Sequence, residues 1–190
     1  MKIILLGFPR TGTTSFHHLF QKLGYNSIHW FYRPQRLYVG EAILKAKKEN
    51  KPLFYYLSDF EVICQMDICK DFTEKIWPQI SHYQQILAQY PDTIYILNTR
   101  DPHKLLLSMK NKGNMDKRML KYNTELFENI EGSDDEKILK LIDQHYQNIR
   151  EHFKNSKFIE FNIEKDNLEK LSKYIDFKGE TQLPKLNKSH

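Results

Sequence analysis

Short apolar runs alternate with amphipathic segments along this chain. The first run, from Ile3 to Leu6, is uninterrupted and is followed by Gly7 and Pro9. Continuous apolar character with β-branched residues is typical of a strand that is buried on both faces of a parallel sheet. Further short strands are expected near Asn26–His29, Leu53–Leu57, Thr93–Leu97 and Lys157–Phe161. Strands that alternate with helical or loop segments predict βαβ units and a parallel sheet.

Helical periodicity follows the first strand directly. Four apolar positions recur at the i, i+3, i+4, i+7 spacing of an amphipathic helix, and Gly24 then supplies a left-handed stop. These positions are Phe16, Leu19, Phe20 and Leu23. The chain is therefore expected to open with a strand, a tight loop and a helix.

Two later helices carry start signals with the spacing of a capping box, in which paired side chains satisfy free backbone N–H groups. The pairs are Ser133 with Glu136, and Asp166 with Glu169. Each pair precedes an apolar stripe, which predicts a helix packed on the core. The stripes are Ile138, Ile142, Tyr146, Ile149 and Phe153 in the first helix, and Leu168, Leu171 and Ile175 in the second.

Composition fits one ordinary globular domain, residues 1–190. The chain is 40% hydrophobic and 28% charged with only seven glycines and seven prolines, which excludes collagen-like and disordered classes. The formal charge of +5 attracts anions, but lysines are spread along the chain, so a small anionic ligand explains it as well as nucleic acid does. The densest basic stretches, Lys45–Lys51 and Lys110–Lys121, are interpreted as solvated helix faces and loops, with a share in holding a charged nucleotide as the alternative.

The cysteines and the start of the chain bear on its compartment. Cys64 and Cys69 lie five residues apart without other metal ligands at finger spacing, which argues against a disulfide framework and a zinc site. The apolar run at Ile3 is too short for a signal segment or a membrane span. We therefore expect a cytoplasmic protein with reduced thiols and no membrane association.

The segment Gly7-Phe8-Pro9-Arg10-Thr11-Gly12-Thr13-Thr14-Ser15 has the glycine spacing of a phosphate loop, G-x-x-x-x-G, between a predicted strand and a predicted helix. Successive backbone N–H groups and the helix N-terminus, which carries roughly half a positive charge, suit phosphate or sulfate oxygens. The motif predicts an α/β, P-loop nucleoside-triphosphate-hydrolase-like three-layer sandwich. Its central, mainly parallel sheet would have about five strands flanked by helices.

One position departs from the nucleotide-hydrolase form of this loop. Thr13 stands where a lysine for the β and γ phosphates should follow Gly12, and a positive charge stands instead at Arg10. A guanidinium binds oxyanions bidentately but cannot act as a general acid, since its pKa lies above about 12. Arg10 is therefore expected to stabilise the transferring oxygens electrostatically.

Two motifs in order resemble the PAPS-dependent sulfotransferase family, in which PAPS is 3'-phosphoadenosine 5'-phosphosulfate. Residues 9–15 are similar to its 5'-phosphosulfate loop. Arg100, followed by Asp101 and Pro102 and then by Ser108 eight residues after the arginine, resembles its 3'-phosphate signature. Asp101 can cap a helix that starts at Pro102, which places Ser108 in the second turn. We expect Arg100 and Ser108 to donate to one phosphate.

The resemblance implies in-line, metal-independent transfer of a sulfuryl group from PAPS to a hydroxyl or amine of a small-molecule or glycan acceptor, leaving adenosine 3',5'-bisphosphate. It implies a set of donor-binding residues at the two motifs. They are Pro9, Arg10, Thr11, Gly12, Thr13, Thr14, Ser15, Arg100 and Ser108. Weaker matches are Ser58-Asp59 as a strand ending in Asp, Tyr90-Pro91, and Pro184 to Asn187, with Leu183 to Ser189 folding back over the donor.

Sulfuryl transfer also needs a base for the acceptor proton. Asp59 is favoured because a carboxylate at the carboxyl end of a parallel strand lies where ligands bind in this architecture. His29 is the second candidate, since a neutral imidazole suits the task, and Glu41 or Glu61 remain nearby alternatives. The expected catalytic residues are thus Arg10, Asp59 and His29, with no metal site.

Three other functions stay open at this point. A P-loop kinase of a small metabolite or nucleoside is the first, although the absent loop lysine counts against it. A nucleotide-binding module without catalysis is the second. Nucleic-acid binding would need clustered basic and aromatic residues, for which 31–36 is the local candidate, and we expect no such partner. A homodimer is left open.

Overall fold

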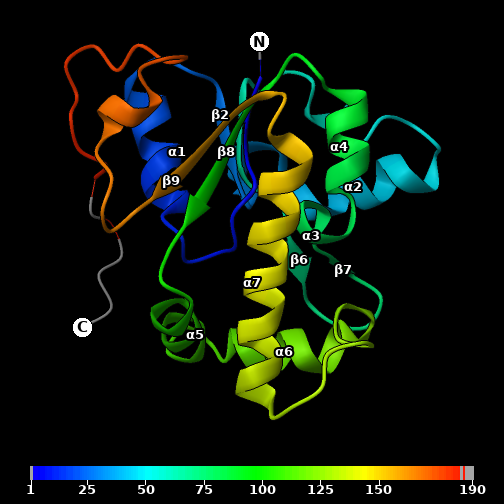
Figure 1. The fold of residues 1–190 in the computed structure, drawn as a ribbon. Helices are drawn as coiled ribbons and strands as arrows, with labels where there is room; N and C mark the ends of the chain where they lie inside the picture. Colours follow the sequence, from blue (N-terminus) through cyan, green and yellow to red (C-terminus); the bar gives the residue numbers. More distant parts are fainter. Residues whose placement is uncertain (1, 185, 187–190) are drawn as a thin grey trace.

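The computed structural model describes residues 2–184 and residue 186, and a parallel sheet runs through its centre (Figure 1). The strand order is β2-β5-β1-β8-β9, and each neighbouring pair is parallel. The strands are β1 (Ile3–Leu5), β2 (Ser27–His29), β5 (Val62–Gln65), β8 (Ile94–Thr99) and β9 (Lys157–Asn162). The predicted α/β sandwich with a parallel sheet of five strands is confirmed.

Helices cover both faces of this sheet and make the three layers. The α1 side also carries the segment that follows β9, whereas α2, α4 and α7 lie on the opposite side (Figure 1). The helices are α1 (Thr13–Lys22), α2 (Val39–Lys48), α3 (Pro78–Ser81), α4 (Tyr83–Gln89), α5 (Pro102–Lys110), α6 (Met115–Tyr122) and α7 (Asp134–Phe153). The sheet therefore separates two hydrophobic cores.

Strand β1 supplies alternate side chains to both cores. Ile3 and Leu5 pack with α1, and Ile4 and Leu6 pack on the α7 side, each with at most 1% of its surface exposed. Side chains of a strand alternate between faces, so an uninterrupted apolar run is what burial on both faces requires. The interpretation of Ile3 to Leu6 as a central buried strand is confirmed.

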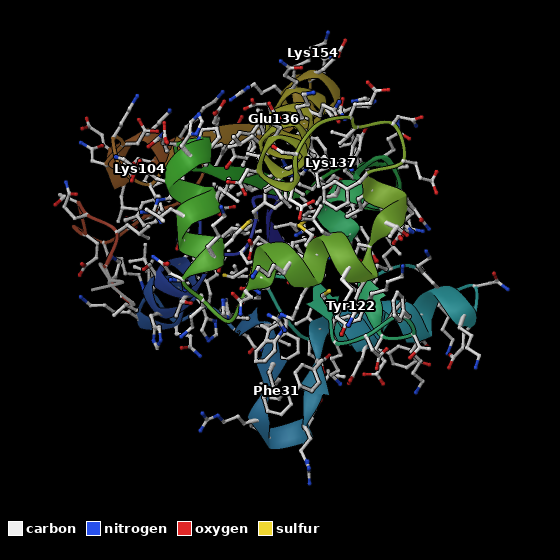
Figure 2. All side chains as sticks on the ribbon, turned by 90° about the horizontal axis from the view of Figure 1, so that it is seen from below. Phe31, Lys104, Tyr122, Glu136, Lys137 and Lys154 are labelled. Atoms are coloured by element: carbon white, nitrogen blue, oxygen red, sulfur yellow. The ribbon has the colours of Figure 1, made fainter. Side chains whose placement is uncertain are left out.

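Smaller elements gather beyond the carboxyl edge of the sheet. Seen from below, α5 and α6 cross this edge and a hairpin carrying Phe31 projects beside it (Figure 2). The short strands form two antiparallel pairs. They are β3 (Phe31–Tyr32) with β4 (Leu37–Tyr38), and β6 (Ile68–Cys69) with β7 (Lys75–Ile76). Single 3-10 turns are η1 (Arg33–Gln35), η2 (Tyr55–Leu57), η3 (Thr124–Leu126) and η4 (Leu168–Leu171).

The predicted strand at Leu53–Leu57 is wrong, because this segment ends in the 3-10 turn η2 and the sheet strand is β5. Its buried side chains are Leu53, Phe54 and Leu57, a helical spacing that lets them pack in the core with α2. Its backbone N–H groups do not pair with a neighbouring strand. Instead, the Leu53 N–H donates to the side chain of Gln89 and the Phe54 N–H to the hydroxyl of Tyr90.

Of the two predicted capping boxes, one is confirmed. At the start of α7, Ser133 and Glu136 bond reciprocally, and the stripe that follows is buried. The second box is wrong, because Asp166 accepts from the Asn162 N–H at 2.7 Å and only the turn η4 follows. Its stripe nevertheless reaches the core on the α1 side, as predicted from the spacing.

Two further structural findings concern the thiols and the membrane. Cys64 and Cys69 are both free, and burial raises the pKa of the Cys64 thiol to about 12. Over residues 2–184 and 186, no helix is long and apolar enough to cross a membrane.

Buried His145 makes folding depend on pH. Its Nε2 donates to the Leu6 carbonyl at 2.7 Å, just beyond β1, and burial lowers its pKa to about 4. At pH values between the ordinary histidine pKa near 6.5 and this lowered pKa, the imidazole is protonated in the unfolded chain and neutral in the folded chain. Stability from His145 is thus complete above pH 6.5 and is lost as the pH falls toward 4, by up to roughly 3 kcal/mol.

We expect His145→Gln to flatten the dependence of the unfolding free energy on pH between 6.5 and 4. The measurement is urea denaturation at a series of pH values, with the exposed His152→Gln as the matched control. Curves for His145→Gln that run parallel to wild type would show that this imidazole is not held neutral by the fold.

Candidate functional site

The loop between β1 and α1, residues 7–12, lies at the carboxyl edge of the sheet and ends at the N-terminus of α1. Arg10 and Gly12 have positive φ angles of 74° and 80°. Consecutive turns of this kind direct backbone N–H groups to one concave side, and the helix N-terminus adds partial positive charge. The local geometry is therefore that of an anion-binding loop, as the glycine spacing predicts.

Asn98 on β8 fixes this loop from below. Its Oδ1 accepts from the Gly7 N–H at 2.9 Å, and its Nδ2 donates to the Thr11 carbonyl at 2.9 Å and to Thr11 Oγ1 at 2.6 Å. All three residues are buried, so each of these bonds satisfies a polar group that water cannot reach. One side chain thereby ties both ends of the loop to the neighbouring strand.

Gly7 is required because the strands approach so closely here. A Cβ at this position would lie 2.0 Å from the Asn98 carbonyl oxygen and 2.7 Å from its side chain. The first glycine of the motif therefore serves the packing of β1 against β8, while Gly12 serves the turn into the helix.

A cavity of about 930 Å³ opens around the loop. Because β1 is central, β2 and β5 deliver residues to one side of it and β8 and β9 to the other. The first side has His29, Trp30, Gln65, Asp67 and Trp77, and the second has Arg100, Ile163, Glu164 and Asp166. The loop thus separates two halves of one continuous cavity.

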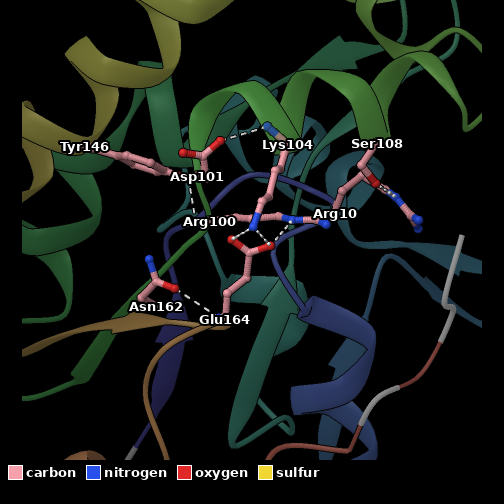
Figure 3. Close-up of polar contacts among 8 residues, drawn as sticks. All are labelled: Arg10, Arg100, Asp101, Lys104, Ser108, Tyr146, Asn162 and Glu164. Carbon is pink, nitrogen blue, oxygen red and sulfur yellow. Dashed lines mark hydrogen bonds and ion pairs between the residues drawn. The ribbon is translucent and has the colours of Figure 1, made fainter.

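The half beyond β8 and β9 combines cations with two carboxylates, of which Asp166 pairs with Lys170 and Glu164 with Arg100. Figure 3 shows Glu164 beside Arg100 and Lys104, at 3.3 Å from the arginine Nε and 3.4 Å from the lysine Nζ. Burial, and then the charge of Arg100, lowers the pKa of the Arg10 guanidinium. Two arginines near each other create a field that favours an anion between them, and Glu164 balances only part of it.

Ser108 and Arg100 are not joined as predicted. The capped helix is confirmed, since Asp101 accepts from the Lys104 N–H at 3.0 Å and α5 starts at Pro102. Ser108 is buried, however, and its Oγ accepts from Arg10 Nε at 3.1 Å, whereas Arg100 pairs with Glu164 (Figure 3). A phosphate shared by Arg100 and Ser108 remains a prediction.

The hydroxyls after Gly12 face the other half of the cavity. Thr13 Oγ1 donates to Gln65 Oε1 at 3.1 Å, and His29 Nε2 lies 3.1 Å from Thr13 Oγ1 and 3.4 Å from Thr14 Oγ1. Burial, followed by the charge of the neighbouring His17, lowers the pKa of His29 to about 4, so its ring is neutral at physiological pH. The structure thus brings the predicted histidine to the predicted loop.

Of the other predicted donor-binding residues in this segment, some line the cavity and one is buried beneath the loop. Pro9 and Ser15 line the cavity, although Ser15 Oγ also accepts from the Leu186 N–H at 3.4 Å. Thr11 is fully buried and donates to the Phe8 carbonyl, so it supports the loop from inside. Part of the predicted 183–189 segment does lie over the loop, because Leu183 and Pro184 line the cavity; residues 185 and 187–189 fall outside the described residues.

Asp59 is placed wrongly by the sequence prediction. It is exposed and precedes β5, where the Ser58 carbonyl accepts from Lys2 and the Asp59 carbonyl accepts from Asn26. Lys2 and Asn26 come before β1 and β2, so Asp59 lies at the amino edge of the sheet, across from the loop. The premise for Asp59 as the base, a position at the carboxyl end of a strand, is contradicted.

The carboxylate that does follow a strand at this edge is Asp67, which the sequence analysis missed. It comes two residues after β5, is 95% buried, and lines the cavity. The signal was present in Val62-Ile63-Cys64, a short β-branched apolar run like that of β1, followed by polar Gln65 and Asp67. Over residues 2–184 and 186, no group of three or more His, Cys, Asp or Glu side chains is arranged to hold a metal.

Comparison with known proteins agrees with this geometry. The model of the sulfotransferase domain family matches residues 2–190. A curated relative, Ava biosynthesis cluster protein M of Aspergillus versicolor, is 28% identical over 115 residues, which make up 58% of this chain and 42% of that protein. The match therefore spans less than half of the relative's length.

Two solved structures are similar in fold. YorR protein of Bacillus subtilis, in complex with phosphorylated GDP, has a TM-score of 0.50 at 17% identity, with 91% of this chain and 92% of that chain covered. Shikimate kinase of Bacteroides thetaiotaomicron has a TM-score of 0.49 at 13% identity, with 85% and 86% covered. At 17% identity the first likeness shows the fold alone, a P-loop-like α/β fold.

Replacement of Asn98 by Ala would leave the Gly7 N–H and the Thr11 carbonyl buried without their partner. We expect Asn98→Ala to lower the unfolding free energy by roughly 2 to 6 kcal/mol, since each of the two unsatisfied buried groups costs about 1 to 3 kcal/mol. Guanidinium denaturation measures the loss, and Asn111→Ala at the exposed end of α5 is the control. A loss no larger than that of the control would contradict the role assigned to Asn98.

Proposed function

The chain belongs to the sulfotransferase domain family, and on this premise we propose that it transfers a sulfuryl group from PAPS to a small acceptor. The observation that carries the proposal is the joint position of an anion-binding loop and two arginines at one edge of the sheet. A donor with a sulfated 5'-phosphate and a separate 3'-phosphate requires two anion sites of this kind. PAPS is the sulfuryl donor in this proposal and a substrate of the reaction.

The loop is the proposed site of the 5'-phosphosulfate. The amides after Arg10 and the N-terminus of α1 supply fixed donors, and Thr13 and Thr14 add hydroxyls on the side facing His29. The Arg10 guanidinium donates to Ser108 at 3.1 Å and is close enough to Arg100 for the charge of that residue to lower its pKa. Preorganised donors of this kind stabilise charge that develops on the leaving phosphate during transfer.

The pair of Arg100 with Glu164 is the proposed site of the 3'-phosphate. An arginine binds a phosphate in the same forked geometry in which it binds a carboxylate. Glu164 therefore stands in for the ligand, and donor binding requires its carboxylate to move away from Arg100. Arg100 and Lys104 would then both face the phosphate, which gives the site a preference for a 3',5'-bisphosphate.

Thr13 occupies the position at which P-loop kinases have a lysine, and this difference supports sulfuryl transfer over a kinase reaction. In P-loop kinases and hydrolases that lysine contacts the β and γ phosphates, and a magnesium ion bridges them. Here the loop carries its own cation, Arg10, whose guanidinium donates to Ser108. We therefore propose an in-line transfer that proceeds without a metal, to a hydroxyl or amine acceptor.

The remaining proposals concern the acceptor, the partners and the compartment. The acceptor is a small molecule or a glycan, and neither nucleic acid nor a membrane is a partner. Free thiols at Cys64 and Cys69 fit a reducing compartment, so we place the protein in the cytoplasm. The homodimer stays a prediction.

Calorimetry with adenosine 3',5'-bisphosphate tests the proposal. We expect binding that persists in a metal chelator and exceeds that of adenosine 5'-monophosphate, whereas preference for magnesium-ATP would favour a kinase. Arg100→Ala should weaken the bisphosphate at least tenfold while the monophosphate changes about twofold or less, because a charge-assisted bond is worth about 1.5 to 3 kcal/mol.

Arg150→Ala is the matched control for this experiment. Arg150 also pairs with a glutamate of β9, Glu160, through two bonds of 2.7 and 2.8 Å, but it does not line the cavity. Equal losses for the two nucleotides in Arg100→Ala would contradict the proposed position of the 3'-phosphate.

A further inference from the structure

Asp67 lies on the side of the cavity away from Arg100 and Glu164. It follows β5, the strand next to β1, and only 5% of its surface is exposed. Within the described part of the chain, no hydrogen bond of ordinary geometry reaches its enclosed Oδ1, although the neighbouring Gln79 side chain acts to lower the pKa of this carboxyl. A buried carboxylate oxygen without a partner is costly, so its persistence beside a cavity points to a ligand that supplies one.

A short chain of hydrogen bonds connects Asp67 to the anion-binding loop. Gln65 donates from Nε2 to Asp67 Oδ2 at 3.4 Å and accepts at Oε1 from Thr13 Oγ1 at 3.1 Å. Thr13 is the residue after Gly12, where the loop becomes helix. The carboxylate is therefore one side chain away from the hydroxyl that faces the proposed sulfonate site.

His29 is engaged differently. With Thr13 Oγ1 donating its one proton to Gln65, the matching tautomer of the neutral His29 ring carries its proton on Nε2 and donates it to Thr13. A ring nitrogen that already holds a proton cannot take another from an acceptor at that atom. The geometry thus assigns His29 to positioning Thr13 and Thr14, and it leaves Asp67 as the carboxylate with a free oxygen.

We propose that Asp67 is the general base of the transfer and that the surrounding half-cavity binds a small alcohol or phenol. This inference rests on the proposed function and names the residue and substrate class of its acceptor side. In the step, the acceptor O–H gives its proton to the Asp67 carboxylate, and the acceptor oxygen forms a bond to sulfur. The bond from sulfur to the 5'-phosphate oxygen breaks, and its electron pair leaves with adenosine 3',5'-bisphosphate.

The walls of this half-cavity favour such an acceptor. Ile68, Trp77 and Met115 line it with apolar surface, which suits the body of a phenol or a small alcohol. Trp77 Nε1 is buried and, within residues 2–184 and 186, also lacks a hydrogen-bond partner. The cavity of about 930 Å³ must hold the donor as well, which limits the acceptor to a small molecule.

Ionisation of Asp67 sets the expected pH dependence. Burial raises its pKa to about 7, against the opposing influence of hydrogen bonds and of Arg118. A base must be deprotonated to act, so activity should rise with pH up to about 7 and then level. The neutral His29, with its pKa near 4, would give no change in this range. The polar and charged groups facing Asp67 or lining the same half-cavity are His29, Gln65, Cys69, Lys70, Gln79, Lys112 and Arg118.

The test uses the whole chain, labelled PAPS and a panel of small phenols and alcohols. For Asp67→Asn we expect kcat to fall about 100-fold or more, as loss of a general base does, with the affinity for adenosine 3',5'-bisphosphate unchanged within about twofold. The wild-type kcat/KM should rise about tenfold per pH unit below 7, and the residual activity of Asp67→Asn should be flat. Asp67→Glu should recover part of the wild-type kcat and the rise of kcat/KM with pH below 7.

Asp116→Asn is the matched control, because Asp116 on α6 is also 5% exposed with an unpartnered Oδ1 in the described structure but does not line the cavity. It should keep wild-type kcat. Full turnover in Asp67→Asn, or a pH limb that survives it, would overturn the assignment of the base. Transfer by wild type to amines and to none of the hydroxyl compounds would overturn the acceptor class.

Failure of the proposed function gives a different result. In that case the wild-type chain would not bind adenosine 3',5'-bisphosphate at all, and no variant would need to be compared. If the wild-type chain binds the donor but its transfer rate does not depend on pH, the proposed donor site stands and only the assignment of Asp67 as the base is contradicted.

Discussion

The site depends on the hydrogen bonds that Asn98 makes to both ends of the loop between β1 and α1. Amides that follow Gly7 can point toward a ligand only if the loop does not collapse onto its own backbone, and a buried side chain from the next strand prevents this. The close approach of the strands then requires a glycine at position 7. Anion binding is thus prepared by polar contacts inside the protein, before any ligand is present.

The strand order distributes the chemistry around that loop. With β1 in the centre, the strands β8 and β9 bring Arg100 and Glu164 to one side, and β5 brings Gln65 and Asp67 to the other. A nucleotide on the first side and an acceptor on the second would meet at the loop, where the charge of the transferred group is balanced. Ligands generally bind at the carboxyl edge of such sheets, where connections leave in opposite directions.

Local signals in the sequence were enough for part of this account. The apolar run at Ile3, the loop to Ser15, the cap at Asp101 and the capping box at Ser133 each lie within a few residues, and the structure confirms each as an element. The strand at Leu53 was wrong because apolar residues at helical spacing also suit a buried 3-10 turn.

Residues that meet only through the fold could not be found in the same way. The base prediction failed with the strand that carried it: once β5 is Val62–Gln65, the carboxylate at its end is Asp67 rather than Asp59. The pairing of Arg100 with Glu164 depends on β8 and β9 lying side by side, and they are more than fifty residues apart in sequence. Similarly, Arg10 and Ser108 meet only because α5 crosses the edge of the sheet.

The central claim is that the loop and Arg100 bind the two phosphates of one nucleotide. A crystal structure with adenosine 3',5'-bisphosphate tests it most directly. The account predicts the 5'-phosphate on the amides around Gly12 and the 3'-phosphate on Arg100, with Glu164 displaced from that arginine. A nucleotide bound elsewhere, or bound in the cavity with the pair of Arg100 and Glu164 still intact, would contradict it.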